Sequence, residues 1–164
     1  MEFEAIADIG DLETVSAESA WQNFERLAAF IFEKNGFAVR VNTVKTGNKT
    51  KRQYDVIAKK GSHTFLVECK KWAGNRYRLS ALRGAVVKHR ERTLFYERMT
   101  NEAAIPVIVT LIEEHIRVFE GVPLVPVSKL NAFIHEWERE GCGNSFCQYE
   151  DEALLDDRET DENF

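Results

Sequence analysis

Apolar residues recur at helical spacing in three parts of the chain and alternate or run together between them. Residues 16–35 carry an apolar stripe with steps of three and four, which predicts a helix buried along one side. Ser16 or Ser19 can cap its start, and Gly36 is a stop signal. The stripe consists of Trp21, Phe24, Leu27, Ala28, Ile31 and Phe32.

Strands are predicted where β-branched residues alternate with polar ones or form short apolar runs. These strands are 37–44, 53–59, 63–71, 105–112 and 122–127, with a short one at 115–119. The polar segment 45–52 is predicted as a flexible turn, and two further helices are expected at 80–99 and 128–140. A meander of three strands followed by a helical crossover predicts an α/β fold, with one mixed β-sheet between helices.

The chain has 164 residues, of which 44% are hydrophobic, enough for one domain with a real core. We place this domain at residues 16–141, after an acidic lead-in (1–15) and before an acidic tail (142–164) that is expected to be disordered. No apolar run approaches a membrane span and no signal peptide is recognisable, so a membrane location is not expected. Three cysteines, an odd and sparse number, indicate a reducing compartment such as the cytoplasm.

Charge is strongly segregated along the chain, although the net charge is only −5. Residues 37–100 carry 16 basic and 4 acidic residues, a net charge of +12. The flanking segments 1–36 and 101–164 have net charges of −6 and −11. Because local rather than net charge attracts a phosphate backbone, the basic middle indicates nucleic acid as a partner. The alternative is that these cations are only the solvated faces of ordinary helices and strands.

Charged residues interrupt two strands that otherwise look buried. Side chains alternate along a strand, so Glu68 and Lys70 point to the same face of the strand 63–71. Asp55 is a lone acid in the preceding strand and can meet Glu68 if the two strands pair through the turn at Gly61. Two converging carboxylates suit a hard cation such as Mg²⁺ or Mn²⁺, with Lys70 stabilising negative charge beside it. A purely structural ion pair between strands is the alternative.

This Asp…Glu-x-Lys arrangement resembles the PD-(D/E)XK nuclease superfamily, which has the restriction-endonuclease-like fold. The resemblance covers about residues 20–140 and includes the order of helices and strands around the motif. It is greatest to Mrr-like restriction endonucleases and archaeal Holliday-junction resolvases, whose strand sequences are similar to Asp-Val-Ile-Ala (55–58) and Val-Glu-Cys-Lys-Lys-Trp (67–72). Tyr54 stands where the name motif has Pro, as it does in many Mrr-like members.

The resemblance implies a role for each residue of this motif. Asp55 and Glu68 would bind the metal, the Cys69 backbone carbonyl would add a ligand, and Lys70 would be the catalytic lysine. Glu25 would assist the metal directly or through water; by spacing alone it is a boundary residue of its helix. DNA would be the substrate, in restriction or repair. A homodimer is compatible with the resemblance, because one site cuts one strand.

Basic residues flank the motif on both sides and are predicted to bind the DNA backbone. They are Lys45, Lys49, Lys51, Arg52, Lys71, Arg76, Arg78 and Arg83. Trp72 and Tyr77 lie among them and could stack on an unpaired base or pack against a helix. Three further cations, Lys88, Arg90 and Arg92, are interpreted as solvating the outer face of the helix 80–99, and His89 as a packed core histidine.

The sequence thus favours a metal-dependent DNA endonuclease. The main rival is a catalytically inactive DNA-binding module of the same fold. A weaker third reading is an interaction protein whose acidic tail binds a protein partner or its own basic groove, where it would compete with DNA.

Overall fold

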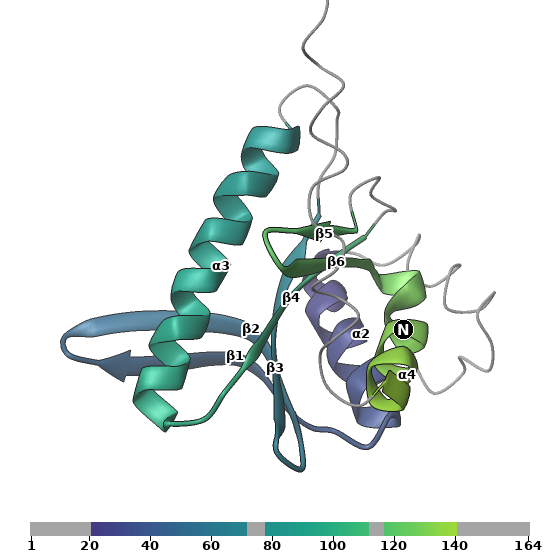
Figure 1. Ribbon diagram of the computed structural model, residues 1–164, viewed down its shortest axis with the longest axis horizontal. Helices are drawn as coiled ribbons and strands as arrows, with labels where there is room; N and C mark the ends of the chain where they lie inside the picture. Colours follow the sequence, from purple (N-terminus) through teal and green to yellow (C-terminus); the bar gives the residue numbers. More distant parts are fainter. Residues whose placement is uncertain (1–20, 72–77, 112–116, 141–164) are drawn as a thin grey trace, which may run out of the picture.

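A six-stranded mixed sheet lies between two layers of helices in the computed structural model, which describes residues 21–71, 78–111 and 117–140 (Figure 1). Helices α2 and α4 cover one face of the sheet and α3 crosses the other. The predicted lead-in, the tail, Trp72, Arg76 and Tyr77 lie outside the described residues. The helices are α2 (Trp21–Lys34), α3 (Arg78–Thr100) and α4 (Leu130–Glu140), the last preceded by a short 3-10 helix (Val127–Lys129).

The strand order is β1-β2-β3-β4-β6-β5. The strands are β1 (Ala38–Gly47), β2 (Thr50–Lys60), β3 (His63–Lys70), β4 (Ile105–Thr110), β5 (Val118–Phe119) and β6 (Val122–Pro126). The first three form an antiparallel meander, and α3 then carries the chain across to β4, which pairs parallel with β3. The restriction-endonuclease-like α/β fold predicted above is therefore confirmed. No helix among the described residues is both long and apolar enough to cross a membrane.

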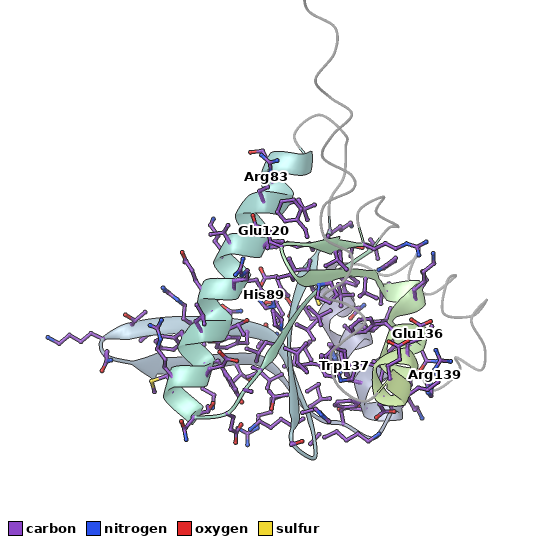
Figure 2. All side chains as sticks on the ribbon, viewed as in Figure 1. Arg83, His89, Glu120, Glu136, Trp137 and Arg139 are labelled. Carbon is purple, nitrogen blue, oxygen red and sulfur yellow. The ribbon has the colours of Figure 1, made fainter. Side chains whose placement is uncertain are left out.

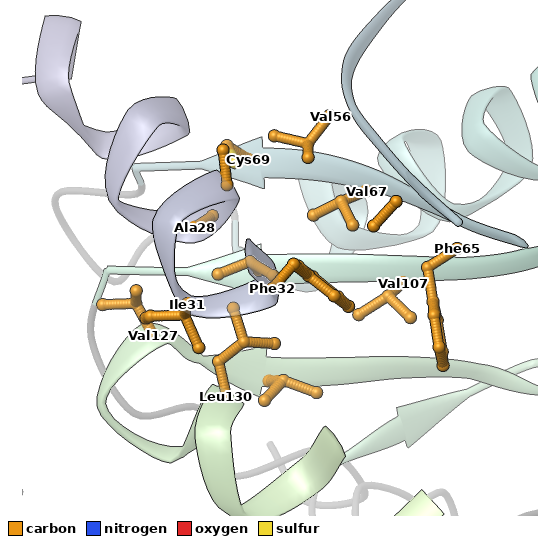
Figure 3. Close-up of a cluster of buried hydrophobic side chains, with 14 of the residues drawn as sticks. Ala28, Ile31, Phe32, Val56, Phe65, Val67, Cys69, Val107, Val127 and Leu130 are labelled. Atoms are coloured by element: carbon orange, nitrogen blue, oxygen red, sulfur yellow. The ribbon is translucent and has the colours of Figure 1, made fainter. Parts of the chain in front are cut away.

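The larger part of the core lies between the sheet and the layer formed by α2 and α4 (Figure 3). Phe65 of β3 is fully buried at its centre. Four aromatic rings lie within 5.4–6.2 Å of the Phe65 ring centroid, namely those of Phe32, Phe37, Phe133 and Trp137. Such edge-on and tilted contacts add specific geometry to the burial of apolar area, so this cluster fixes both helices on the sheet.

Helix α2 ends as the sequence predicts, at a glycine. Gly36 has a φ of +80°, which a residue without a Cβ adopts without strain. The N–H of Gly36 donates to the carbonyl of Glu33, and the N–H of Phe37 donates to the carbonyl of Phe32. These two bonds form a Schellman motif, which turns the chain from α2 into β1.

The predicted flexible turn at 45–52 is wrong, because β1 and β2 extend far into it. Gly47 pairs with Thr50, which leaves only Asn48 and Lys49 as the turn. Both have positive φ values, +47° and +64°, as a two-residue hairpin turn of the favoured twist requires. The segment has no hydrophobic alternation because its outer part projects beyond the sheet core, as a two-stranded arm (Figure 1). Sequence periodicity therefore missed these paired strands.

Helix α3 buries one stripe of side chains against the opposite face of the sheet. Leu82, Val86 and Tyr96 lie in this interface. His89 is also buried, and its Nε2 lies 2.8 Å from the carbonyl oxygen of Leu66 on β3. A carbonyl only accepts, so Nε2 carries the proton, and burial lowers the pKa of His89, which keeps the ring neutral. The interpretation of His89 as a core residue is confirmed.

Candidate active site

The predicted Glu-x-Lys pair lies at the end of β3, on the face that α3 covers. Glu68 and Lys70 share this face with Leu66, whereas the side chain of Cys69 packs into the core under α2. Glu68 is buried, and its carboxylate Oε1 lies 2.7 Å from the Lys70 Nζ. The prediction that both side chains share one face of β3 is confirmed.

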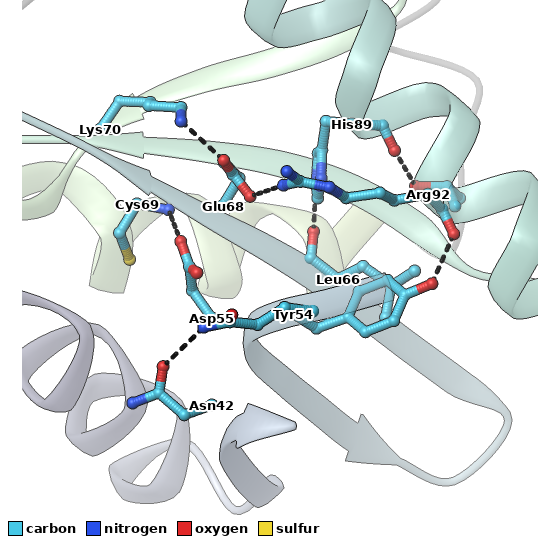
Figure 4. Close-up of polar contacts among 11 residues, drawn as sticks. Asn42, Tyr54, Asp55, Leu66, Glu68, Cys69, Lys70, His89 and Arg92 are labelled. Carbon is cyan, nitrogen blue, oxygen red and sulfur yellow. Dashed lines mark hydrogen bonds and ion pairs between the residues drawn. The ribbon is translucent and has the colours of Figure 1, made fainter. Parts of the chain in front are cut away.

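Asp55 lies at the point where β2 and β3 part. The described pairing of these strands ends at Val56 and Val67, and the same register would set Asp55 opposite Glu68. β2 changes face here, since Tyr54 and Ile57 belong to one cluster on the α3 side and Val56 to the core under α2. The Asp55 carboxylate accepts the backbone N–H of Cys69 at 2.9 Å (Figure 4). The Asp55 carboxylate therefore replaces a backbone carbonyl of β2 as the acceptor for this N–H.

The neighbouring strand β1 is distorted at the same level of the sheet. The pairs Val41 with Val56 and Thr43 with Tyr54 leave Asn42 facing Asp55 without a ladder pair. Asn42 has a φ of +50°, in the left-handed region that Asn tolerates better than most residues. Both strands of the hairpin therefore turn at this level, and the turn directs Asp55 away from the regular ladder.

Arg92 of α3 completes the ion pairs around Glu68, and here the sequence interpretation was wrong. We expected Arg92 on the solvated outer face of the helix. Instead its Nη1 lies 2.5 Å from Glu68 Oε2, and only 29% of its side chain is exposed (Figure 4). The arginine reaches sideways from the helix because its long stem can lie along apolar surface while its guanidinium meets the carboxylate. Lys88 and Arg90 are exposed, as expected.

Tyr54 holds α3 in the position that this contact needs. Its hydroxyl donates to the backbone carbonyl of Arg92 at 2.7 Å, and its ring packs edge-on against Tyr96. Burial raises the pKa of Tyr54 to about 12, so the hydroxyl keeps its proton at neutral pH. The residue that replaces the motif proline thus links β2 to α3.

The pKa of Asp55 is raised from its ordinary value of 3.8 to about 6. Burial is the main cause, and the negative charge of Glu68 adds to it. The Cys69 N–H and the charge of Lys70 act in the opposite direction, while Glu25 raises the pKa further. Glu25 is half-buried on α2, so this third predicted acid is close enough to Asp55 for their charges to interact.

A pH titration tests this environment directly. We expect the Asp55 carboxyl to titrate near pH 6 in the metal-free protein, by NMR of its side-chain carbon. Because the folded pKa lies above the unfolded one, the contribution of Asp55 to stability is present below pH 4 and is lost as the pH rises through 6. The variant Asp55→Asn should remove that slope from the free energy of unfolding. A titration near pH 4 would contradict a pKa of Asp55 that is raised by burial and by the charge of Glu68.

The carboxylates around Asp55 have the donor chemistry that a divalent cation prefers. Glu25, Asp55 and Glu68 offer carboxylate oxygens, which Mg²⁺ and Mn²⁺ prefer, and their repulsion is what a bound cation would relieve. As arranged, however, both Glu68 oxygens are bonded to cations. Among the described residues no three His, Cys, Asp or Glu side chains form a ready metal cluster.

The basic residues that are predicted to bind DNA and that the structure describes lie on several different elements. Lys49 and Lys51 are exposed on the outer part of the hairpin. Lys45 and Arg52 are half-buried, with their charged groups over the rings of Tyr96 and Phe95 at 6.0 and 5.9 Å. Cation–π contacts of this kind tie the hairpin to α3, so these two residues have a structural role besides their charge.

The other residues that are predicted to contact DNA lie on other parts of the chain. Lys71 is exposed directly after β3, and Arg83 is exposed near the start of α3 (Figure 2). Arg83 and Tyr96 are 13 positions apart in the sequence, a distance of about 20 Å along the helix. The structure gives no description of the Arg78 side chain.

Comparison with known proteins identifies the family. A family model described as a restriction endonuclease, of the Mrr catalytic type, matches residues 16–105, more than half of the chain. The chain belongs to the Mrr-type restriction endonuclease family. An uncharacterized protein of Archaeoglobus fulgidus is 32% identical over 114 residues, which cover 70% of this chain and 88% of that protein.

One solved structure shares the fold of this Mrr-type domain. The small subunit of the heterodimeric restriction endonuclease R.BspD6I matches 83% of this chain and 80% of its own, with a TM-score of 0.52 and 18% identity. A crystallised protein of unknown function matches with a TM-score of 0.43 and 18% identity, and this chain spans about half of it (54%). The family implies a nuclease-type domain and DNA as its substrate.

Proposed function

We propose that this Mrr-type domain is a metal-dependent deoxyribonuclease that hydrolyses phosphodiester bonds. The observation that carries the proposal is the meeting of Asp55 with Glu68 and Lys70 where β2 and β3 part, with the pKa of Asp55 raised to about 6. Carboxylates that repel one another in a half-buried site are costly for folding alone, and a cation offsets that cost.

Asp55, Glu68, the Cys69 carbonyl and Glu25, the last through water, are the groups that would hold Mg²⁺ or Mn²⁺. A bound divalent ion supplies a Lewis acid, which lowers the pKa of water and neutralises charge on the phosphate. Lys70 orients the attacking water or stabilises the negative charge that develops on the phosphate oxygens. Its ammonium is positioned for this by the 2.7 Å contact with Glu68. Tyr54 and His89 keep α3 against the strands that carry these residues.

One observation favours a catalytically inactive DNA-binding module instead. Both Glu68 oxygens are paired with cations, which is also the geometry of a structural ion pair. A panel of end-labelled single strand, duplex, flap and junction DNA, incubated with Mg²⁺ or Mn²⁺ and with EDTA, separates the two functions. Metal-dependent cutting is expected, and it would also rank the substrates. DNA retarded on a gel but never cut would support the inactive module.

The exposed tip of the hairpin is proposed to contact the DNA backbone. Replacing Lys49 and Lys51 together by Ala should weaken DNA binding about tenfold near 0.1 M salt and reduce the salt slope by about 2, since each phosphate contact contributes about 0.9. A control that replaces Lys34 and Lys129, on the side of α2 and α4, removes the same charge. Equal losses of DNA affinity in the two double variants would show that only the net charge of the protein matters for binding.

A partner subunit also belongs to the proposal. One site of this kind cuts one strand, so a double-strand break needs a second site. The relative R.BspD6I is a heterodimer by its name, and a homodimer or a second subunit would serve the same purpose here. Sedimentation of the protein with and without DNA measures this directly.

A further inference from the structure

Glu68 is held by two cations that come from different elements. Lys70 lies on the same strand, and Arg92 reaches across from α3. The carboxylate side chain is only 8% exposed, so water contributes little to its solvation. Because each of its oxygens already has a positively charged hydrogen-bond partner, a further cation that approaches either oxygen meets a positive charge beside it.

The helix that carries Arg92 is fixed more firmly than the arginine side chain. Tyr54 donates to the Arg92 carbonyl at 2.7 Å, and His89 bonds the Leu66 carbonyl one helical turn earlier. The guanidinium is at the end of a flexible stem, and the Arg92 side chain as a whole is 29% exposed. A side-chain rotation can therefore free Glu68 Oε2 while α3 stays in place.

We propose that Arg92 is a latch on the metal site: its guanidinium neutralises Glu68 while no metal is bound, and it must leave Oε2 before that oxygen can ligate a divalent cation. The inference rests on the proposed metal-binding role of Glu68. Arg92 then acts in two opposite ways. It stabilises the metal-free protein by pairing a buried carboxylate, and it lowers metal affinity because its positive charge competes with the cation. In this role Arg92 is a positioning residue that acts through Glu68.

Mn²⁺ binding without DNA tests the latch without relying on cleavage. Isothermal titration of the full chain with Mn²⁺ at neutral pH compares the wild type with Arg92→Met, which keeps an apolar stem and removes the charge. We expect Arg92→Met to bind Mn²⁺ at least about tenfold more tightly. The metal-free variant should unfold at a lower temperature than the wild type, and Mn²⁺ should raise its melting temperature by more.

Arg90→Met is the matched control. Arg90 lies two residues earlier on α3, is exposed, and pairs with Glu120 at 3.1 Å on the surface. It removes the same charge from the same helix, and its Mn²⁺ affinity should stay within about twofold of the wild type, because exposed charges are screened. An equal gain in both variants would overturn the latch and leave only a general electrostatic effect.

The remaining outcomes also decide the question. Unchanged or weaker Mn²⁺ binding by Arg92→Met, with metal-dependent cleavage still seen in the wild type, overturns the latch and leaves the nuclease proposal standing. Absence of Mn²⁺ binding in both proteins overturns the latch together with the proposed metal site. If circular dichroism shows that Arg92→Met does not fold, Arg92→Gln, which keeps a neutral donor for Glu68, replaces it with the same expected direction.

Discussion

The variant Lys70→Ala is expected to cut DNA at least about 1,000-fold more slowly than the wild type, a loss of about 4 kcal/mol in transition-state stabilisation. The ammonium of Lys70 lies 2.7 Å from Glu68 and faces the same side of β3, so its removal takes away the cation that is proposed to act on the reacting phosphate. Single-turnover cleavage of an end-labelled substrate at saturating Mg²⁺ measures this rate apart from product release.

Lys71→Ala is the matched control for this variant. Lys71 is the next residue in the chain, is exposed, and lies directly after the end of β3. It carries the same charge but makes at most a backbone contact with DNA, so its loss should change the cleavage rate by less than about tenfold. The nuclease mechanism would be in error if the two variants lost activity equally, or if Lys70→Ala cut at the wild-type rate.

Phe65→Ala is expected to lower the free energy of unfolding by about 3–5 kcal/mol, the usual cost of deleting a fully buried aromatic ring. Phe65 is completely buried and is the ring on which α2, α4 and the turn into β1 converge. Its loss would leave a cavity among four aromatic neighbours. Urea unfolding followed by circular dichroism measures the change.

Leu94→Ala on the outer face of α3 provides the comparison for Phe65. The Leu94 side chain is half exposed, so its truncation should change stability by about 0.5 kcal/mol or less. A loss below about 1 kcal/mol for Phe65→Ala would mean that the two helices are not held through this cluster.

The sheet and its helices were largely predictable because most of them bury one face. The part of the predicted apolar stripe from Phe24 to Phe32 in α2 and residues 107–110 of β4 are buried, as the sequence predicts. The hairpin was missed for a physical reason. Its outer residues, such as Thr46 and Lys51, pair with each other but bury little, so backbone hydrogen bonds rather than apolar alternation define the strands.

The candidate site was predictable as far as strand geometry determines it. The alternation of Glu68 and Lys70 and the register through Gly61 follow from the sequence. Arg92 was missed because it was interpreted as a solvated residue, whereas it lies at the edge of the buried stripe of α3 and its long stem lets the guanidinium reach Glu68. Its spacing of three from His89, a residue predicted to face the core, was the one available indication.

The most direct test of the account is the initial rate of DNA cleavage by the wild type and by Asp55→Asn over a range of Mg²⁺ concentrations, with EDTA as the zero point. Asn keeps the size of Asp55 but removes the charge that the proposed metal site needs. We predict a wild-type rate that rises with Mg²⁺ and saturates, and no cleavage by Asp55→Asn at any concentration. Cleavage by the wild type in EDTA, or an unchanged rate in Asp55→Asn, would contradict the account.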